Sequence, residues 1–276
     1  MESKVIIVTG ASGGIGRLVV KEMLHEGHKV YACARNLDVL KSTNHPNLVL
    51  LYLDLRDEKS IADAVKVVKE QEGRADVLVN NAGYGLMGPF EMISMEDARK
   101  EMDVNLFGMV HLTQLVLPLM RMRGSGRIVN VSSVAGRAPL HLFGWYNISK
   151  YAVEAFTDCL RMEVKDFGVQ VSLVEPAPIR TQWGIIAADS LAEHTQGTPY
   201  EQMGKDRAAN LRNAYQSQLF SPPASVARSI RHAIVDRHPR LRYRSGRGAG
   251  LIIALHSLLP TRYWDAIMRG MLKVKL

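Results

Sequence analysis

The sequence predicts an α/β protein whose core is a doubly wound, mostly parallel sheet of seven strands with helices on both faces. Strand-like and helix-like segments alternate between residues 5 and 176, the pattern of a parallel sheet whose strands are joined by helices. The predicted strands are nearly continuous apolar runs, as expected for strands buried on both faces. A chain of 276 residues, 47% hydrophobic and 22% charged, suits one large core. We therefore expect a single domain over residues 1–276.

The alternating segments follow one another in a regular order. The β-branched run Val5–Val8 predicts the first strand, and Ile15, Leu18, Val19 and Met23 then recur at helical spacing, which predicts a helix to about residue 25. The same reasoning predicts strands at 30–34, 48–53, 77–79, 128–131 and 169–174, and helices at 61–68, 98–122 and 146–167.

The regular alternation ends after Pro176. Residues 181–220 contain no strand-like run, so we expect a mobile lid over a site, with short helices at most. The remaining predicted elements are a helix opened by Pro222 and Pro223 and running to about Val235, an edge strand at 241–243, and an amphipathic helical tail over 249–276 that is broken at Pro260.

Composition limits the compartments and partners. Cys33 and Cys159 lie in apolar runs without metal-site spacing, so we expect two buried free thiols in a reducing compartment. The first residues lack a signal-peptide pattern, and no apolar run reaches the length of a membrane span, so we expect a cytoplasmic protein. The net charge is +8, with seven arginines and one acid between Arg228 and Arg247. A solvated surface is the favoured interpretation of that stretch, and contact with phosphate, anionic lipid or nucleic acid is the alternative.

A glycine-rich turn joins the first predicted strand to the first helix. Residues 9–16 read TGASGGIG. Glycines permit a tight turn and let the backbone approach a pyrophosphate, and the helix N-terminus offers free N–H groups and positive dipole charge to that anion. Dinucleotide binding is therefore favoured over a simple turn at this junction. The expected contacts are Gly10, Ser12, Gly13, Gly14, Ile15 and Gly16.

The end of the second predicted strand indicates which nicotinamide cofactor binds. A carboxylate there would select NAD by hydrogen bonding to the ribose hydroxyls. This chain instead has Ala34 followed by Arg35, whose guanidinium can hold a 2′-phosphate through charge-assisted hydrogen bonds. We therefore expect NADP(H), with an exposed loop arginine as the alternative.

The ends of the third and fourth predicted strands carry residues suited to adenosine. We expect Asp54 and Leu55 near the edge of the adenine ring, and Asn81, Ala82 and Gly83 near the ribose. Small side chains allow the close backbone approach that the ribose needs. Ordinary turn chemistry is the alternative for both segments.

Tyr146, Lys150 and Ser133 form the candidate catalytic group. Tyr146 and Lys150 are four residues apart at the start of a predicted helix, so they share one face. We expect the lysine ammonium to lower the pKa of the phenol, so that the phenol exchanges a proton near neutral pH. Ser133 follows the strand at 128–131, at the edge where open α/β sheets bind ligands.

Five segments resemble the short-chain dehydrogenase/reductase family: TGASGGIG at 9–16, NNAG at 80–83, VNLFG at 104–108, IVNVSS at 128–133 and YNISK at 146–150. They occur in the family's order and at its usual intervals, over roughly residues 4–181. The resemblance implies a single-domain Rossmann fold and a catalytic tetrad. In this tetrad Tyr146 is the acid/base and Ser133 orients the substrate oxygen. Lys150 binds the nicotinamide ribose and tunes the tyrosine, and Asn105 holds a water linked to Lys150.

The turn after the sixth strand departs from the family pattern. The family commonly has Pro-Gly there, whereas this chain has Pro176, Ala177 and Pro178. We expect the methyl group of Ala177 to crowd the nicotinamide edge without abolishing cofactor binding. Thr181 matches the position that usually bonds the carboxamide. The cofactor contacts predicted here are Pro176, Ala177, Ile179 and Thr181, and Asn105, Tyr146 and Lys150 complete the set.

Aromatic and apolar residues flank the catalytic group, which suits a lipophilic alcohol or ketone. Beside Ser133 and Tyr146, the residues expected at the substrate mouth are His141, Phe143, Trp145, Ala177 and Trp183. His141 is either an anchor for a distal oxygen or a surface residue, and Trp145 either lines the mouth or packs in the core. Within the family, the chain is similar to the branch of 17β-hydroxysteroid dehydrogenases, retinol dehydrogenases and acyl-dihydroxyacetone-phosphate reductases.

The expected function is NADP(H)-dependent interconversion of a carbonyl and an alcohol on a steroid- or retinoid-like substrate, with reduction as the cellular direction. The alternatives are an acyl-dihydroxyacetone-phosphate reductase, with residues 228–247 meeting the phosphate, and a non-catalytic NADP-sensing regulator, which the intact catalytic residues disfavour. We expect no metal and no nucleic-acid partner. The resemblance implies a homodimer or homotetramer through helices 98–122 and 146–167. The tail covers the cleft, packs in an oligomer or contacts a membrane surface.

Overall fold

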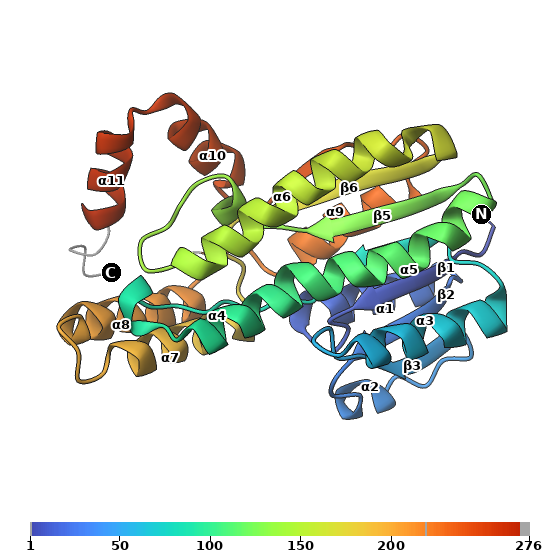
Figure 1. Ribbon diagram of the computed structural model, residues 1–276, viewed down its shortest axis with the longest axis horizontal. Coiled ribbons are helices and arrows are strands. Elements are labelled where there is room, and N and C mark those ends of the chain that lie inside the picture. Colours follow the sequence, from blue (N-terminus) through green and yellow to red (C-terminus); the bar gives the residue numbers. More distant parts are fainter. Residues whose placement is uncertain (1, 219, 271–276) are drawn as a thin grey trace.

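Seven parallel strands form the centre of the protein, in the order β3-β2-β1-β4-β5-β6-β7. The structure is a computed structural model that describes residues 2–218 and 220–270 (Figure 1). The predicted fold class is confirmed, with every strand pair parallel. The strands are β1 (Val5–Thr9), β2 (Lys29–Ala34), β3 (Leu48–Tyr52), β4 (Val77–Asn80), β5 (Gly126–Val131), β6 (Val169–Pro176) and β7 (Arg242–Ser245).

Helices connect successive strands and cover both faces of the sheet. Figure 1 shows α3, α5 and α6 across one side, and α7, α8, α10 and α11 gathered beyond one end of the sheet. The longer helices are α1 (Gly14–His25), α3 (Glu58–Glu72), α4 (Met95–Met102), α5 (Gly108–Met122), α6 (Gly144–Val164), α7 (Gln182–Thr195), α8 (Glu201–Gln216), α9 (Ala224–Val235), α10 (Ala249–Leu258) and α11 (Thr261–Gly270). Shorter turns are α2 (Asp38–Lys41), the 3₁₀ segments η1 (Phe90–Met92), η3 (Val134–Gly136) and η4 (Lys165–Phe167), and the π-helical turn η2 (Asp103–Phe107).

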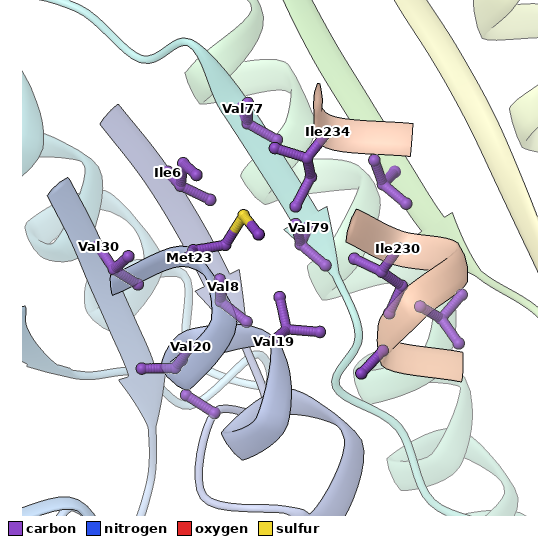
Figure 2. Close-up of a cluster of buried hydrophobic side chains, with 14 of the residues drawn as sticks. Ile6, Val8, Val19, Val20, Met23, Val30, Val77, Val79, Ile230 and Ile234 are labelled. Atoms are coloured by element: carbon purple, nitrogen blue, oxygen red, sulfur yellow. The ribbon is translucent and has the colours of Figure 1, made fainter. Parts of the chain in front are cut away.

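Two hydrophobic cores lie on opposite faces of the sheet. Successive strand residues point to opposite faces, so Ile6 and Val8 enter one core while Val5 and Ile7 enter the other. Figure 2 shows the first core, in which side chains of α1 and α9 meet those of β1 and β4. The second core is covered by α3, α5 and α6. Because both faces are buried, the central strands are mostly apolar, as the sequence pattern indicates, with a few buried polar residues such as Asn80 and Asn130, which are hydrogen-bonded to each other.

The long helix predicted over 98–122 begins at Met95 and contains the π-helical turn η2. By length and composition alone, the run Met95–Met122 is able to cross a membrane, contrary to our expectation that no segment reaches that length. Core helices of soluble proteins pass the same test, and α5 packs against α3 and the central strands. We therefore interpret this run as a core helix.

Two other expectations are corrected by the structure. The region 181–220, predicted with short helices at most, forms α7 and α8, which have 14 and 16 residues and pack against each other. Cys159, predicted to be buried, is exposed on α6, because it lies on the helix face that also carries the exposed Met162. Cys33 is buried as expected.

The tail forms two helices, α10 and α11, separated at Pro260 as predicted, and the end of the predicted tail, 271–276, lies outside the described residues. Ala249 and Ile253 of α10 pack against Ala177 in the turn after β6. Trp264 of α11 is buried and donates a hydrogen bond from Nε1 to the carbonyl of Pro139, at 2.9 Å. These contacts attach the tail beside the carboxyl end of the sheet.

A buried ion cluster attaches the edge strand β7. Arg242 donates to Glu175 of β6 at 2.9 Å and to Asp158 of α6 at 2.6 Å, and it also pairs with Glu154. Glu175 is completely buried, so its charge depends on this arginine. Arg137 and Arg244 approach the same carboxylate only to 3.7 and 3.8 Å.

We expect Arg242→Met to destabilise the protein strongly, because it leaves the buried charge of Glu175 without its closest partner. Breaking a buried ion pair on one side costs about 3–5 kcal/mol, and the two more distant arginines place the expected loss near the lower value. Chemical denaturation measures the free energy of unfolding. Lys59→Met, which breaks the exposed Lys59–Asp63 pair, is the control and should leave the free energy of unfolding nearly unchanged. Equal losses in the two variants would refute a structural role for the cluster.

Candidate active site

One cavity of about 750 Å³ runs along the carboxyl ends of the strands. It lies where the strand order reverses between β1 and β4, the position at which open parallel sheets bind ligands. It joins the glycine turn at one side to the catalytic residues and α7 at the other. Among the predicted residues that line it are Gly10, Ser12, Gly13, Gly14, Ile15, Arg35, Asp54, Leu55, Asn81, Ala82, Gly83, Ser133, Phe143, Tyr146, Lys150, Pro176, Ala177, Ile179, Thr181 and Trp183.

The glycine turn has the backbone geometry that anion binding requires. Gly10 has a φ of +64°, and a Cβ on it would lie 2.9 Å from Cα of Ala82, so only glycine fits this close approach. The helix α1 begins at Gly14, and no side chain caps its N-terminus. Its first N–H groups are therefore free for an anion in the cavity. Gly16 was expected to contact the cofactor, but it does not line the cavity. A Cβ on Gly16 would lie 2.3 Å from the carbonyl oxygen of Gly10, so a glycine is needed there for packing within the turn.

Arg35 follows β2 and lines the cavity, and no carboxylate stands at the end of that strand. Within the described part of the chain, Arg35 forms no ion pair. The nearby Asp54 is occupied by Arg56, which donates to it from its backbone and from its guanidinium at distances down to 2.6 Å. These hydrogen bonds lower the pKa of Asp54. Arg35 is therefore the cation with free hydrogen-bond donors at this end of the cavity.

The loop after β4 is fastened to the glycine turn. The amide nitrogen of Asn81 and that of Ala82 each donate to Oγ1 of Thr9 at 3.0 Å, and Nδ2 of Asn81 donates to the Thr9 carbonyl at 3.0 Å. The side chain of Asn81 therefore holds two walls of the cavity together. The predicted contact of this loop with the ribose stays a prediction.

The candidate catalytic residues meet where β5 ends and α6 begins. Tyr146 and Lys150 are one helical turn apart on α6 and are only 8% and 5% exposed. The Nζ of Lys150 lies 5.8 Å from the centre of the Tyr146 ring and donates to the carbonyl of Val131 at 3.0 Å. Ser133 follows β5; its Oγ accepts from the backbone N–H of Ala135 at 3.1 Å, and its hydroxyl is close enough to Tyr146 to lower the pKa of the phenol. The structure thus brings together the three residues that the sequence placed in one group.

Burial decides the ionisation of this group. It raises the pKa of Tyr146 above the usual range of a phenol, and the hydrogen bond from Ser133 opposes this shift. Burial also lowers the pKa of Lys150 to about 8, although the charges of Glu101 and Glu154 raise it. The expectation that Lys150 lowers the pKa of the tyrosine is wrong: burial and the charge of Glu101 raise it, and Ser133 is the group that lowers it. The phenol is neutral at neutral pH and holds a proton that it can donate.

Asn105 lies behind the cavity wall, in the π-helical turn η2. We expected it to contact the cofactor, but it does not line the cavity. Its Oδ1 accepts from the backbone N–H of Tyr84 at 3.0 Å, and its Nδ2 donates to the Tyr84 carbonyl at 2.8 Å. A Cβ placed on Gly83 would lie 3.0 Å from Oδ1 of Asn105 and 3.5 Å from Nζ of Lys150. The missing side chain of Gly83 therefore leaves the space between Asn105 and Lys150 open.

Glu101, one turn before Asn105, is a buried acid that the sequence analysis did not identify. It is completely buried, and its Oε1 accepts from the backbone N–H of Leu86 at 3.2 Å and from Nδ2 of Asn105 at 3.3 Å. Its Oε2 has no hydrogen-bond partner. Burial raises the pKa of Glu101 to about 8, against the charge of Lys150, which lowers it. Glu101 thus places a second titratable group behind the catalytic residues.

The substrate end of the cavity is largely aromatic. Trp183 of α7 lies 5.1 Å from the Tyr146 ring and 6.5 Å from that of Tyr215 on α8, centre to centre. Phe143 lies 6.4 Å from Tyr146. The cavity-lining residues that the sequence analysis missed include Tyr84, Leu140, Gln182, Ile186 and Tyr215.

Two residues predicted at the substrate mouth, His141 and Trp145, do not line the cavity. Trp145 packs with Leu86, Ile93 and Ala98, so the alternative interpretation as a core residue is confirmed. His141 lies in the loop before α6 and does not reach the cavity lining. Ala177 does line the cavity, and its methyl group also packs under α10, which explains why a side chain is accommodated there.

Comparison with known proteins finds relatives that extend over the whole chain. Residues 4–188 match the model of the short chain dehydrogenase family. The chain is 33% identical to the probable short-chain type dehydrogenase/reductase VdlC of Helicobacter pylori, covering 95% of this chain and 96% of that protein. It is 34% identical to retinol dehydrogenase 16 of Rattus norvegicus, covering 97% and 88%. A short chain dehydrogenase from Burkholderia cenocepacia, solved in complex with NADP, has a TM-score of 0.74 and 25% identity, covering 97% and 98%.

We expect Glu101→Gln to change how stability depends on pH. The pKa of Glu101 is about 8 in the folded protein and ordinarily 4.5, so between these values the folded state retains a proton that the unfolded chain has released. Stability contributed by this group is therefore present below about pH 4.5 and is lost as pH rises towards 8. The variant should gain in melting temperature relative to wild type from pH 5 to pH 8.

The control is Glu70→Gln on the exposed side of α3. It should show the same difference from wild type at every pH. A Glu101→Gln curve parallel to that of wild type would contradict the assignment of Glu101 as a buried, protonated acid.

Proposed function

Because the chain belongs to the short-chain dehydrogenase/reductase family, and is therefore an oxidoreductase, we propose that it is an NADP(H)-dependent enzyme that interconverts a carbonyl and an alcohol on a lipophilic substrate. The observation that carries this proposal is the meeting of Tyr146, Ser133 and Lys150 in the cavity that also contains the glycine turn and Arg35. A single cavity that contains both parts supports a reaction between a bound dinucleotide and a carbonyl next to Tyr146.

The cavity fits a dinucleotide with a 2′-phosphate. Its volume of about 750 Å³ is within the range of ligand-binding cavities. The uncapped start of α1 suits the pyrophosphate, and the free guanidinium of Arg35 suits the 2′-phosphate. The related Burkholderia cenocepacia structure was solved with NADP, which supports the same choice.

In the proposed reaction, each of the three residues has a separate role in the reduction of the carbonyl. NADPH, when bound, supplies the hydride that forms the new C–H bond at the carbonyl carbon. Tyr146 donates its phenolic proton to the carbonyl oxygen, whose π-bond electrons form the new O–H bond, and it accepts that proton in the reverse direction. Ser133 orients the same oxygen by hydrogen bonding, and the ammonium of Lys150 stabilises the phenolate that remains. The neutral phenol in this structure favours reduction, because reduction begins with a proton to donate.

The lining of the substrate end supports a steroid- or retinoid-like substrate. Phe143, Trp183 and Tyr215 offer aromatic surface next to Tyr146. The relative retinol dehydrogenase 16 acts, by its name, on retinol.

The structure disfavours the alternative in which the arginine-rich stretch 228–247 meets a substrate phosphate. None of its described residues lines the cavity, and Arg231 and Arg242 are paired with carboxylates elsewhere.

The assembly and location of the enzyme are further parts of the proposal. Exposed apolar side chains on and beside the helices of the second core support a homo-oligomer. These side chains are Phe107, Met122, Ile148, Tyr151, Met162 and Phe167. The exposed residues Leu251, Leu255, Leu258, Tyr263 and Ile267 of the tail support peripheral contact with a membrane by a cytoplasmic protein.

Tyr146→Phe removes the proton that the proposed mechanism transfers while keeping the ring in place. We expect kcat for NADPH-dependent reduction of a panel of retinal, steroid ketones and small ketones to fall by about 10²–10⁴-fold. Binding of NADPH, followed by its fluorescence, should be retained. Tyr151→Phe, on the exposed side of the same helix, is the control and should keep wild-type activity. Full turnover by Tyr146→Phe would refute the mechanism.

Arg35→Ala tests the choice of cofactor. Loss of charge-assisted hydrogen bonds worth about 1.5–3 kcal/mol should weaken NADPH binding roughly 10- to 150-fold and leave NADH binding nearly unchanged. Titration of each cofactor by fluorescence gives the two dissociation constants. Lys41→Ala removes an exposed positive charge nearby in the sequence and serves as the control. If both cofactors weaken equally in Arg35→Ala, the phosphate role is rejected.

A further inference from the structure

A group of basic residues lies beyond Phe143, which lines the substrate end of the cavity, although none of the group lines the cavity itself. Arg207 belongs to α8, His141 to the loop before α6, and Arg269 to α11. Figure 1 shows α8 and α11 at the same end of the molecule, beyond the sheet. The hydrogen bond from Trp264 to Pro139 attaches α11 to the loop that carries His141. The three residues are thus brought together by a lid helix, a loop and the tail.

Arg207 is a largely buried cation without a counter-ion. Its Cζ lies 6.0 Å from the centre of the Phe143 ring, and its buried Nε has no hydrogen-bond partner. Over residues 2–218 and 220–270, no carboxylate pairs with it, and burial lowers its pKa. On the same helix Arg212 pairs with Asp189 at 2.5 Å, as an ordinary surface arginine does.

His141 adds a second unpaired polar atom to this group. Its Nδ1 is buried and has no hydrogen-bond partner. Burial lowers the pKa of His141, and the positive charges of Arg207 and Arg269 lower it further. The imidazole is therefore neutral near pH 7, and its N–H can donate a hydrogen bond without adding charge.

The group lies one aromatic side chain away from the catalytic tyrosine. The ring of Phe143 contacts Arg207 on one side and the Tyr146 ring, at 6.4 Å, on the other. Arg207 also lies within electrostatic range of Tyr215, which lines the cavity. Arg207 does not itself line the cavity, but it and Tyr146 are both neighbours of Phe143, so a substrate whose carbonyl meets Tyr146 has to extend past that one ring to reach Arg207.

Partial burial of a cation is unfavourable unless an anion or a set of hydrogen bonds compensates for it. The chain supplies neither to Arg207 in its described residues. We infer that the lipophilic substrate carries an anionic group, a carboxylate or a phosphate monoester, which Arg207 and His141 bind while the carbonyl lies at Tyr146. This inference rests on the proposed function and specifies its substrate class. The anionic group and the carbonyl are separated by about the width of one aromatic side chain.

The test uses probes that cannot be reduced, so that binding is measured apart from turnover. Isothermal titration of the NADP⁺-saturated protein compares dodecanoate, dodecyl phosphate and dodecanol, each below its micellar concentration. We expect an anionic probe to bind at least about tenfold more tightly than dodecanol, because a charge-assisted contact contributes more than a neutral one. Whichever of the two anions binds more tightly identifies the anionic group.

Variants at position 207 assign the effect to one side chain. Arg207→Met keeps an apolar contact with Phe143 and removes the charge, so it should weaken the anionic probe at least about tenfold and leave dodecanol unchanged. Arg207→Lys should retain part of the affinity. The control Arg212→Met changes an exposed arginine on the same helix and should bind all probes as wild type does.

Two outcomes overturn the inference. One is equal affinity of wild type for the anionic probes and dodecanol, and the other is a loss in Arg207→Met that is the same for charged and neutral probes. If the anionic probe binds through Arg207 but no carbonyl compound is reduced with NADPH, the proposed function fails and the anion site stands. If reduction occurs with no preference for anions, the proposed function stands and the anion site fails.

Discussion

Burial of both faces of the parallel sheet is the constraint on which the rest of this structure depends. Successive residues of β1 enter two different cores, so polar groups within the sheet are few and mostly paired with one another, as Asn80 is with Asn130. The polar groups that line the cavity lie mainly at or just after the carboxyl ends of the strands, where the chain leaves the sheet. The glycine turn, Arg35, Asn81 and Ser133 all lie at that edge, and one cavity connects them.

The same burial sets the acid–base behaviour of the site. Tyr146, Lys150 and Glu101 are all deeply buried, and burial moves the pKa of each towards its neutral form. The charge of Glu101 raises the pKa of Lys150, and the charge of Lys150 lowers the pKa of Glu101, so each group limits the shift that burial causes in the other. The phenol thus holds its proton near neutral pH.

Sequence reasoning predicted which residues line the cavity where their position depends on a short local motif. The glycine turn, Arg35, Ser133 and the Tyr146–Lys150 pair each follow directly from a strand or lie on one helical turn, so the fold class places them. It missed residues whose position in the site depends on tertiary packing between distant elements.

Tyr215 reaches the cavity only because α7 and α8 pack together, and the burial of Glu101 depends on contacts with the loop after β4 and with Asn105 in the π-helical turn, neither of which has a sequence signal. Trp145 adjoins Tyr146 in sequence but points elsewhere, since neighbouring residues of a helix are about 100° apart around its axis.

The turn after β6 belongs at once to the cavity, through Ala177, and to the tail, through the contact of that residue with Ala249 and Ile253. The C-terminal segment is therefore a place where evolution can alter the shape of the reaction chamber while every catalytic residue stays the same. Relatives that differ mainly in their last thirty residues should then diverge in the molecules they accept before they diverge in chemistry.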